Sequence, residues 1–277
     1  MGYAVVLGEA LLDLLDTEYA GEPVYRQAIG GGPLNVAVGV ARLGGRVQFV
    51  GSVGDDTPAG RIRDFLTANR VGVDGLVTVA APTALAVATF AGAEPEFRFY
   101  GEPPSYGLLT AEAVDTALVT GADVLYCGSI ALLRPDSRQA ARHAWALAGT
   151  ALRVFDPNVR PDLLGGGSTL DDLRALVAAF AGSAHLVKLS AADAELLYPG
   201  RTPEQVADRL RDLGTQVVVV TLGAAGALVA AGADPVRVPA PQVDAVDATG
   251  AGDSVMAALV ADLLADGAPA RPEEWAG

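Results

Sequence analysis

The feature that most constrains the fold of this chain is the alternation of short apolar runs with longer segments of helical periodicity. Apolar runs such as Val124–Cys127 and Leu186–Leu189 are too short for helices, and a helical pattern follows each of them. Val217–Thr221 opens with four valines, which is typical of a parallel strand buried on both faces. Repeated strand–helix units predict an α/β fold with a mostly parallel sheet and helices on both faces.

Two pairs of strand patterns interrupt this alternation because no helix separates the members of a pair. The four segments are Leu11–Leu15, Val24–Ile29, Thr83–Ala91 and Glu96–Tyr100. A polar turn, residues 16–23, joins the first pair, and residues 92–95 join the second. We expect a small β-strand lid over the strand ends, formed by two insertions at about 10–32 and 83–102. The chain shows no internal repeat or linker, so residues 1–277 are predicted to form a single α/β domain that carries this lid.

Composition excludes several classes of partner. The net charge is −14, which argues against nucleic acid and against an anionic membrane surface as partners. Cys127 is the only cysteine, so an intrachain disulfide is impossible and a reducing compartment fits. The N-terminus has no basic leader pattern, and no apolar run is long enough to span a membrane. The expected location is therefore cytoplasmic.

A glycine-rich loop near the end of the chain predicts an anion site. Residues 243–254 lead into an apolar, alanine-rich helix that has no breaker before Gly267. Gly250 and Gly252 allow the free N–H groups of the helix start to approach an anion closely. Asp253 in the first turn would repel a resting phosphate, but it could take a proton from a hydroxyl that attacks a phosphoryl group. An ordinary acidic helix start is the alternative interpretation.

Two long motifs together resemble one enzyme family. They are Gly-Gly-Gly-Pro-Leu-Asn-Val-Ala-Val-Gly-Val-Ala-Arg-Leu-Gly at residues 30–44 and Asp-Ala-Thr-Gly-Ala-Gly-Asp-Ser at residues 247–254. In this order and separation they resemble the N- and C-terminal signatures of the ribokinase-like (PfkB) carbohydrate kinases, and the resemblance covers essentially the whole chain. Gly8-Glu9 followed by Asp13, and the segments 97–100, 156–160 and 187–190, resemble the fructokinase branch. The resemblance implies a transferase that moves a phosphoryl group from ATP to a primary hydroxyl of a sugar, with fructose as the first substrate.

The resemblance also implies roles for single residues. Asp253 would be the general base, assisted by the backbone of Gly250, Ala251 and Gly252. The predicted substrate-binding residues are Asp13, Gly31, Gly32, Asn35, Arg98 and Arg160. Simpler explanations exist for several of them: a turn residue for Asp13, helix entry for the glycines, a local helix-end bond for Asn35 and a solvated strand position for Arg98.

ATP would bind along the carboxyl ends of the strands. The implied nucleotide-binding residues are Lys188, Ser190, Thr221, Gly223 and Gly226. The chain lacks the Gly-Lys-Ser/Thr of a P-loop, so P-loop chemistry is not expected. Mg²⁺ is the implied cofactor and a monovalent cation such as K⁺ a further one, and the implied metal residues are Asp193, Asp247 and Thr249. Asp193 departs from the glutamate that is usual in the family, and Ser190 stands where asparagine is usual.

Two alternatives remain open at this stage. A 2-keto-3-deoxygluconate kinase is one, because Arg98, Tyr100 and Arg160 could serve a substrate carboxylate as well as hydroxyls. A catalytically weak sugar-binding protein is the other, because related chains continue beyond the anion-site helix whereas this one ends at Gly277. A nucleoside kinase is disfavoured, since the first lid hairpin has no aromatic cluster suited to stacking a base. Exposed edges of the lid strands make a homodimer plausible.

Overall fold

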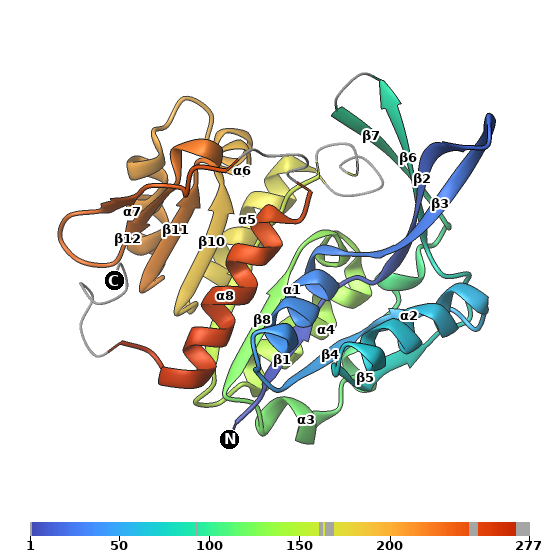
Figure 1. Ribbon diagram of the computed structural model, residues 1–277. Coiled ribbons are helices and arrows are strands. Elements are labelled where there is room, and N and C mark those ends of the chain that lie inside the picture. Colours follow the sequence, from blue (N-terminus) through green and yellow to red (C-terminus); the bar gives the residue numbers. More distant parts are fainter. Residues whose placement is uncertain (1, 92–93, 161–162, 164–168, 244–248, 270–277) are drawn as a thin grey trace.

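The computed structural model describes residues 2–91, 94–160, 163, 169–243 and 249–269 (Figure 1). In this part of the chain nine strands form one sheet, in the order β13-β12-β11-β10-β9-β8-β1-β4-β5. The strands from β5 to β11 run parallel, whereas β12 and β13 are antiparallel to their neighbours. The prediction of a mostly parallel sheet is therefore confirmed. The strand bounds are β1 Ala4–Leu7, β4 Val47–Val53, β5 Gly72–Thr78, β8 Val124–Gly128, β9 Leu152–Asp156, β10 Leu186–Ser190, β11 Val217–Thr221, β12 Ala227–Ala230 and β13 Val236–Val238.

Helices cover both faces of this sheet and enclose two main cores. On one face α1, α2 and α8 pack over a core that includes Val6, Phe49 and Tyr126 (Figure 1). On the other face α4, α5 and α7 pack over a core that includes Phe155 and Phe180, whose rings stack. The helix bounds are α1 Gly32–Arg42, α2 Thr57–Ala68, α3 Thr116–Thr120, α4 Pro135–Leu147, α5 Leu170–Ala181, α6 Ala191–Leu197, α7 Pro203–Leu213 and α8 Ala251–Asp266, with short 3-10 turns η1 Ser105–Gly107, η2 Ala111–Ala113, η3 Ile130–Leu133 and η5 Gly223–Ala225.

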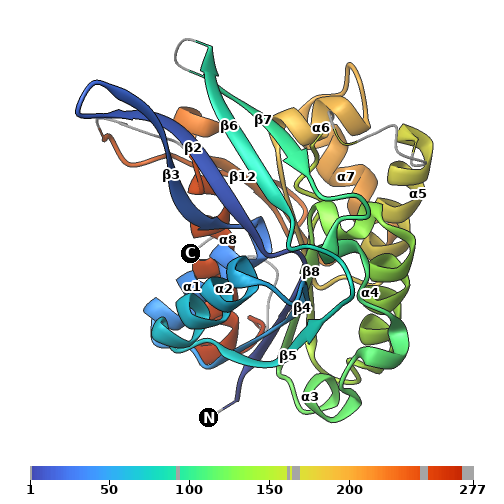
Figure 2. The same ribbon diagram turned by 90° about the vertical axis from the view of Figure 1, so that its right-hand side faces the viewer.

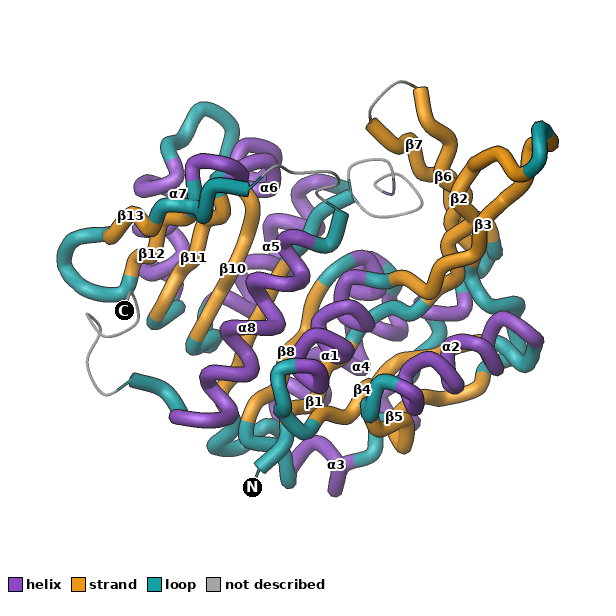
Figure 3. The backbone as a smooth tube through the Cα atoms, viewed as in Figure 1, coloured by secondary structure: helices purple, strands orange, loops and turns teal. Residues whose placement is uncertain are grey.

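Four further strands form a separate small sheet in the order β3-β2-β6-β7. They are β2 Leu11–Tyr19, β3 Glu22–Gly30, β6 Leu85–Ala91 and β7 Glu94–Tyr100. The two insertions pair through β2 and β6, which run parallel. Figures 2 and 3 show this small sheet standing away from the helices and strands of the large one. The two strand pairs expected from the sequence therefore do form one sheet.

The first hairpin is longer than predicted. The segment 16–23, expected as a polar turn, is mostly strand, and only Ala20 and Gly21 turn the chain, with φ of 54° and 82°. The outer half of β2 is exposed, so polar side chains there remain hydrated and do not interrupt the pairing. Glu94 and Pro95, expected in a turn, likewise belong to β7.

Other elements differ from the sequence-based expectations at the edges of the large sheet. β5, β12 and β13 were not expected. β5 and β13 are the edge strands of the sheet, where burial, and therefore hydrophobic patterning, is weaker, whereas β12 is mostly buried but only four residues long. The N-cap of α2 is Asp56, whose carboxylate accepts from the backbone N–H of Ala59. Among the described residues, no helix has both the length and the apolar character needed to cross a membrane.

Candidate active site

The candidate site lies at the carboxyl ends of the parallel strands, where polar residues follow buried ones. Asp156 ends β9, Ser190 ends β10 and Thr221 ends β11, and the three strands are neighbours in the sheet. Ser190 and Thr221 are direct partners in the register of β10 and β11. The topology therefore gathers at one edge residues that are far apart in the sequence, as expected for open α/β sheets.

Asn35 and Asp253 join the two long motifs. The Asn35 side-chain amide donates a hydrogen bond of 2.9 Å to Oδ2 of Asp253 across 218 residues of sequence. The contact exists because α1 packs along α8, so that the starts of both helices meet. Burial raises the pKa of Asp253, and the bond from Asn35 together with the charges of Lys188 and Arg160 opposes that rise. The carboxylate is thus partly desolvated and oriented.

A buried ion pair lies beside this carboxylate. The Lys188 ammonium and Oδ2 of Asp156 are 2.8 Å apart, and their side chains are 5% and 1% exposed. Burial raises the pKa of Asp156 to about 6, although Lys188 opposes the rise. Burial alone would lower the pKa of Lys188, but Asp156 and the neighbouring Asp193 and Asp253 raise it overall. At neutral pH the pair is therefore charged.

The first turn of α8 is built around two glycines. Gly250 is the N-cap, has a φ of 77° and supplies no side-chain cap to the helix. A Cβ added to Gly252 would lie 3.0 Å from Nζ of Lys188, so the ammonium is packed directly against this turn. Backbone N–H groups, the helix dipole and one lysine thus act on the same place, which suits an anion.

Glycines 30 to 32 bring the small sheet against the same region. Gly31 has a φ of 120°, and a Cβ there would lie 2.4 Å from the carbonyl oxygen of Glu9. A Cβ on Gly30 would lie 2.1 Å from Oδ2 of Asp13, and one on Gly32 would lie 3.5 Å from Oδ1 of Asp253. The absent side chains let the backbone pass between Asp13 and Asp253. Burial raises the pKa of Asp13 to about 6.

The two predicted arginines are placed differently. Arg160 donates to Oδ1 of Asn158 at 2.7 Å, and its charge acts on Asp253. Arg98 is exposed on β7. Its neighbour Phe99 pairs with Ala86 of β6, and Ala86 pairs with Asp13 of β2, so Phe99 and Asp13 lie in one row across the small sheet. Successive strand residues point to opposite faces, so Arg98 lies on the face opposite Asp13. The structure brings Arg160, and not Arg98, toward the other predicted substrate residues.

The predicted metal residues are only partly described. Oδ2 of Asp193 accepts from the backbone N–H and the hydroxyl of Ser190, and Oδ1 accepts from the N–H of Val159 at 2.8 Å. Asp193 therefore completes the capping box of α6, whose N-cap is Ser190, and also fixes the loop after β9. Thr249 directly precedes the α8 cap, and Asp247 lies outside the described residues. Within the described ranges no group of three or more His, Cys, Asp and Glu side chains is arranged to hold a metal ion.

The predicted nucleotide loop follows β11 as a tight turn. Gly223 and Gly226 have φ of 59° and 91°, and the short η5 turn lies between them. A Cβ on Gly226 would lie 2.0 Å from the carbonyl oxygen of Val238, so β13 packs against this loop. Thr221 is half-buried at the strand end.

Sequence reasoning missed two residues of this region. Glu9 is 2% exposed and accepts hydrogen bonds from the backbone N–H groups of Gly32 and Ala131, both at 3.2 Å. A carboxylate directly after the buried run of β1 was the signal that could have identified it. Phe99 is the second missed residue. It follows Arg98 in a strand, and because successive strand residues point to opposite faces, it could have been assigned to the face that Arg98 does not occupy.

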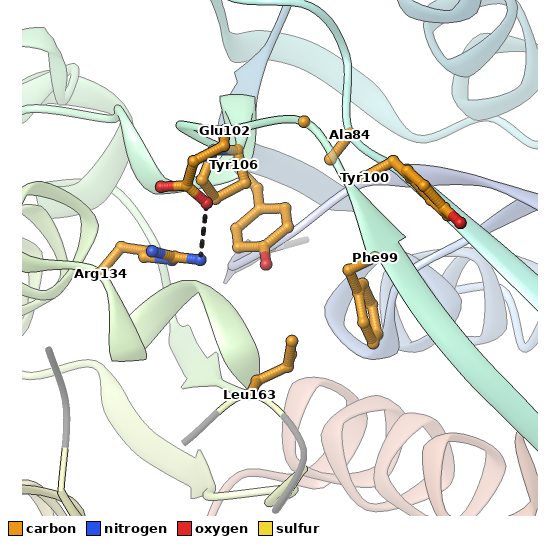
Figure 4. Close-up of a pocket in the computed structure, with 9 residues that line it drawn as sticks. Ala84, Phe99, Tyr100, Glu102, Tyr106, Arg134 and Leu163 are labelled. Atoms are coloured by element: carbon orange, nitrogen blue, oxygen red, sulfur yellow. Dashed lines mark ion pairs between the residues drawn. The ribbon is translucent and has the colours of Figure 1, made fainter. Parts of the chain in front are cut away.

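A cavity of about 210 Å³ lies at the base of the small sheet (Figure 4). Its lining includes Phe99, Tyr106, Leu163 and the ion pair between Arg134 and Glu102, whose charged atoms are 3.7 Å apart. Figure 4 shows the rings of Phe99 and Tyr106 on either side of the space above Leu163. Tyr100, which the sequence suggested for a substrate carboxylate, and Phe99, which shares a cross-strand row with Asp13, line this cavity, whereas Asn35 and Asp253 do not.

Comparisons with known proteins agree with this geometry. The model of the pfkB family carbohydrate kinases matches residues 1–271. Fructokinase-1 of Zea mays is 34% identical over 98% of this chain and 85% of its own length, and fructokinase-1 of Oryza sativa subsp. japonica is 35% identical over 95% and 83%.

Solved structures give the same answer. The structure of a Xylella fastidiosa fructokinase with bound ATP has a TM-score of 0.87 and 28% identity, covering 99% of this chain and 84% of its own. The aminoimidazole riboside kinase of Salmonella enterica has a TM-score of 0.84 and 28% identity, covering 96% and 86%. The fold, the two joined motifs and these matches together show that this chain belongs to the PfkB family of carbohydrate kinases.

Proposed function

We propose that this chain transfers the γ-phosphoryl group of ATP to a primary hydroxyl of fructose, with Asp253 as the general base. The observation that carries the proposal is the hydrogen bond between Asn35 and Asp253, because it places the base at an uncapped helix N-terminus beside the buried ammonium of Lys188. A base and an anion site at one point are what phosphoryl transfer to a hydroxyl requires.

Asp253 and the first turn of α8 have separate roles in the chemical step. Asp253 accepts the proton of the attacking hydroxyl, and its raised pKa makes it a better base than an exposed aspartate. The hydroxyl oxygen forms a bond to the γ-phosphorus as the bond to the leaving ADP oxygen breaks. Backbone N–H groups of residues 250–253 and the Lys188 ammonium stabilise the negative charge of the phosphoryl oxygens. Asn35 holds the base in place.

Sugar binding falls to the small sheet and to the start of α1. Asp13 faces the glycine run and suits a pair of sugar hydroxyls as an acceptor. Gly32 lacks a side chain beside Asp253, which leaves room for the sugar to approach the backbone, and Gly31 allows the chain to turn there with a φ of 120°. Arg160 supplies the nearby positive charge. Arg98 is omitted from this set because of the face it occupies. The small sheet would act as a lid over this pocket, within a single domain.

The oxygen donors near Lys188 fit a Mg²⁺ ion that travels with ATP. Mg²⁺ keeps several waters and takes phosphate oxygens, so one or two protein carboxylates suffice. Both oxygens of Asp156 and both oxygens of Asp193 already accept hydrogen bonds, so either carboxylate would act through water molecules of the ion. The ion would supply charge neutralisation to the phosphates. A K⁺ site at Thr249 and Asp247 is proposed from the family resemblance alone.

The substrate proposal rests on the fructokinase relatives, and the similarity to an aminoimidazole riboside kinase supplies the main competitor. The 2-keto-3-deoxygluconate alternative is weaker than the sequence suggested, because Arg98 lies away from Asp13 and leaves Arg160 as the arginine for a carboxylate. We also propose that two copies pair through the small sheet, where Tyr19 and Tyr25 are exposed, and sedimentation velocity measures this directly.

An ADP-release assay on a panel of acceptors tests the function. Fructose, 2-keto-3-deoxygluconate, ribose, adenosine and aminoimidazole riboside are each supplied with ATP and Mg²⁺. We expect the highest kcat/KM with fructose. A higher kcat/KM with the keto acid or with a riboside would replace fructose, and ADP release with none of the five would contradict the proposed function.

A further inference from the structure

Glu9 has no role in the proposed chemistry, yet it is a buried carboxylate at the junction of three parts of the molecule. It follows β1, a fully buried inner strand of the parallel region, and it is 2% exposed. Its Oε1 accepts from the N–H of Gly32 and its Oε2 from the N–H of Ala131, each at 3.2 Å. Ser129 adds a side-chain hydrogen bond to the same carboxylate. A buried ionised group with this many donors holds their positions firmly.

The two backbone donors belong to segments on opposite sides of the site. Gly32 is the first residue of α1 and the last of the glycine run that leads out of the small sheet. Ala131 lies in η3, in the loop that follows β8. The backbone carbonyl of Glu9 also closes on Gly31, where a Cβ would lie 2.4 Å away. Glu9 therefore contacts the glycine junction with both its side chain and its backbone.

We propose that Glu9 is a positioning residue that fixes the glycine junction against the loop after β8 and thereby sets the geometry of the sugar pocket. Its effect reaches the reacting groups through α1, because the helix that starts at Gly32 carries Asn35, and Asn35 orients Asp253. The inference rests on the proposed function for its kinetic consequence, but the anchoring itself does not depend on which sugar is used.

The ionised form of Glu9 is required, because only a carboxylate presents an acceptor oxygen to both N–H groups. Burial raises the pKa of Glu9 to about 7, and the hydrogen bonds from Ser129 and the backbone, with the charge of Arg160, oppose the rise. The other titratable groups that act on it are Tyr106 and Tyr126, whose pKa values are raised far above neutrality, so both stay uncharged. Anchoring therefore strengthens as the pH rises through about 7.

Glu9→Gln tests the proposal because it resembles the protonated side chain. At pH 8 we expect the KM for the sugar to rise about tenfold, while the KM for ATP changes less than about twofold. At pH 6 wild type itself is largely protonated at this position, so the ratio of the two sugar KM values should fall toward one. A purely structural role would give the same ratio at both pH values, and that result would overturn the proposal.

Asp115→Asn is the matched control. The Asp115 carboxylate also accepts from two backbone N–H groups, those of Ala117 and Leu118, but it caps α3 at the opposite end of the molecule from the small sheet (Figure 1). Both KM values of this variant should match those of wild type at pH 6 and pH 8. A rise in its sugar KM equal to that of Glu9→Gln would show a general effect of replacing a carboxylate that accepts from backbone N–H groups, and would also overturn the proposal.

Hydrogen–deuterium exchange gives a readout that needs no substrate. Glu9→Gln should speed exchange in residues 30–35 and 129–133 and leave the segment around Asp115 unchanged. Wild-type exchange rates in both segments would overturn the anchoring whatever the acceptor panel shows, so failure of the proposed function and failure of this inference remain distinct. If Glu9→Gln does not fold, Ser129→Ala removes one hydrogen bond to the same carboxylate and should raise the sugar KM about two- to tenfold at pH 8.

Discussion

Polar residues of the candidate site are buried more completely in the large sheet than in the small sheet. In the large sheet, strands such as β8 and β11 are buried along nearly their whole length, and Lys188 and Asp156 form an ion pair that is almost fully removed from solvent. In the small sheet, the outer half of β2 is exposed, and Asp13 lies half-buried, with burial as the cause of its pKa shift and no opposite charge from the described residues opposing it. The large sheet is a fixed base, whereas the small sheet meets it mainly at its inner end.

The difference suggests a division of labour. Charge stabilisation requires donors that do not move during the reaction, and the large sheet with α8 supplies them. Recognition of a substrate that must enter and leave suits a sheet with fewer buried contacts, since such regions open at lower free energy. Changes on the large-sheet side should therefore lower kcat or stability, and changes on the small-sheet side should raise the KM for the sugar.

Asp253→Asn should have the largest effect. The amide cannot accept the proton of the attacking hydroxyl, so kcat should fall about 10²- to 10⁴-fold, with the KM for the sugar nearly unchanged. Steady-state kinetics of ADP release measure both values. Asp262→Asn, at an exposed position of the same helix, is the control and should retain the wild-type rate. A variant at position 253 with a near-wild-type kcat would remove Asp253 from the role of base.

Lys188→Met should destabilise the fold, because it leaves the Asp156 carboxylate buried without its partner. Removing one member of a buried pair costs about 3–5 kcal/mol of the free energy of unfolding. Denaturant titration at pH 7.5 measures this cost. Asp171→Asn breaks the exposed pair of Asp171 with Arg174, whose side chains are 89% and 35% exposed, and should change stability by less than about 1 kcal/mol. Equal losses in the two variants would refute the contrast between a buried and an exposed pair.

Asp13→Asn should have the smallest of the three effects and a different kinetic signature. We expect the KM for the sugar to rise about 10- to 100-fold, because a charged acceptor is lost, with kcat within a few fold of wild type. Asp16→Asn, at an exposed position farther along β2, serves as the control and should leave both constants unchanged. A fall in kcat without a rise in KM would contradict the assignment of recognition to the small sheet.

The pH dependence sharpens this test. The pKa of Asp13 is raised to about 6, so the wild-type sugar KM should rise as the pH falls through 6, and the Asp13→Asn variant should keep only the rise near pH 7 that protonation of Glu9 causes. The contribution of Asp13 to the free energy of unfolding changes with pH in the opposite direction. A carboxyl group whose pKa is higher in the folded state binds protons preferentially when folded, so its contribution to stability is complete below about pH 4 and is lost as the pH rises through 6.

Sequence patterns predicted the strands and helices best where burial was complete. The valine run of β11 appears as expected. Exposed strands were harder, as the length of the first hairpin and the unexpected β13 show. In those elements solvent tolerates any polar residue, so the pattern carries less information about pairing.

The sequence by itself determined the fold class, the family and the motifs that carry Asp253 and Asn35, because periodicity and glycine placement are local properties of the chain. Only the tertiary structure decided that these two side chains touch, that Arg98 faces away from Asp13, and that Glu9 joins the glycine junction to the loop after β8. Those facts depend on strand order, register and helix packing. A hydrogen bond between residues 218 positions apart requires all three to be correct at once, and no local pattern encodes them.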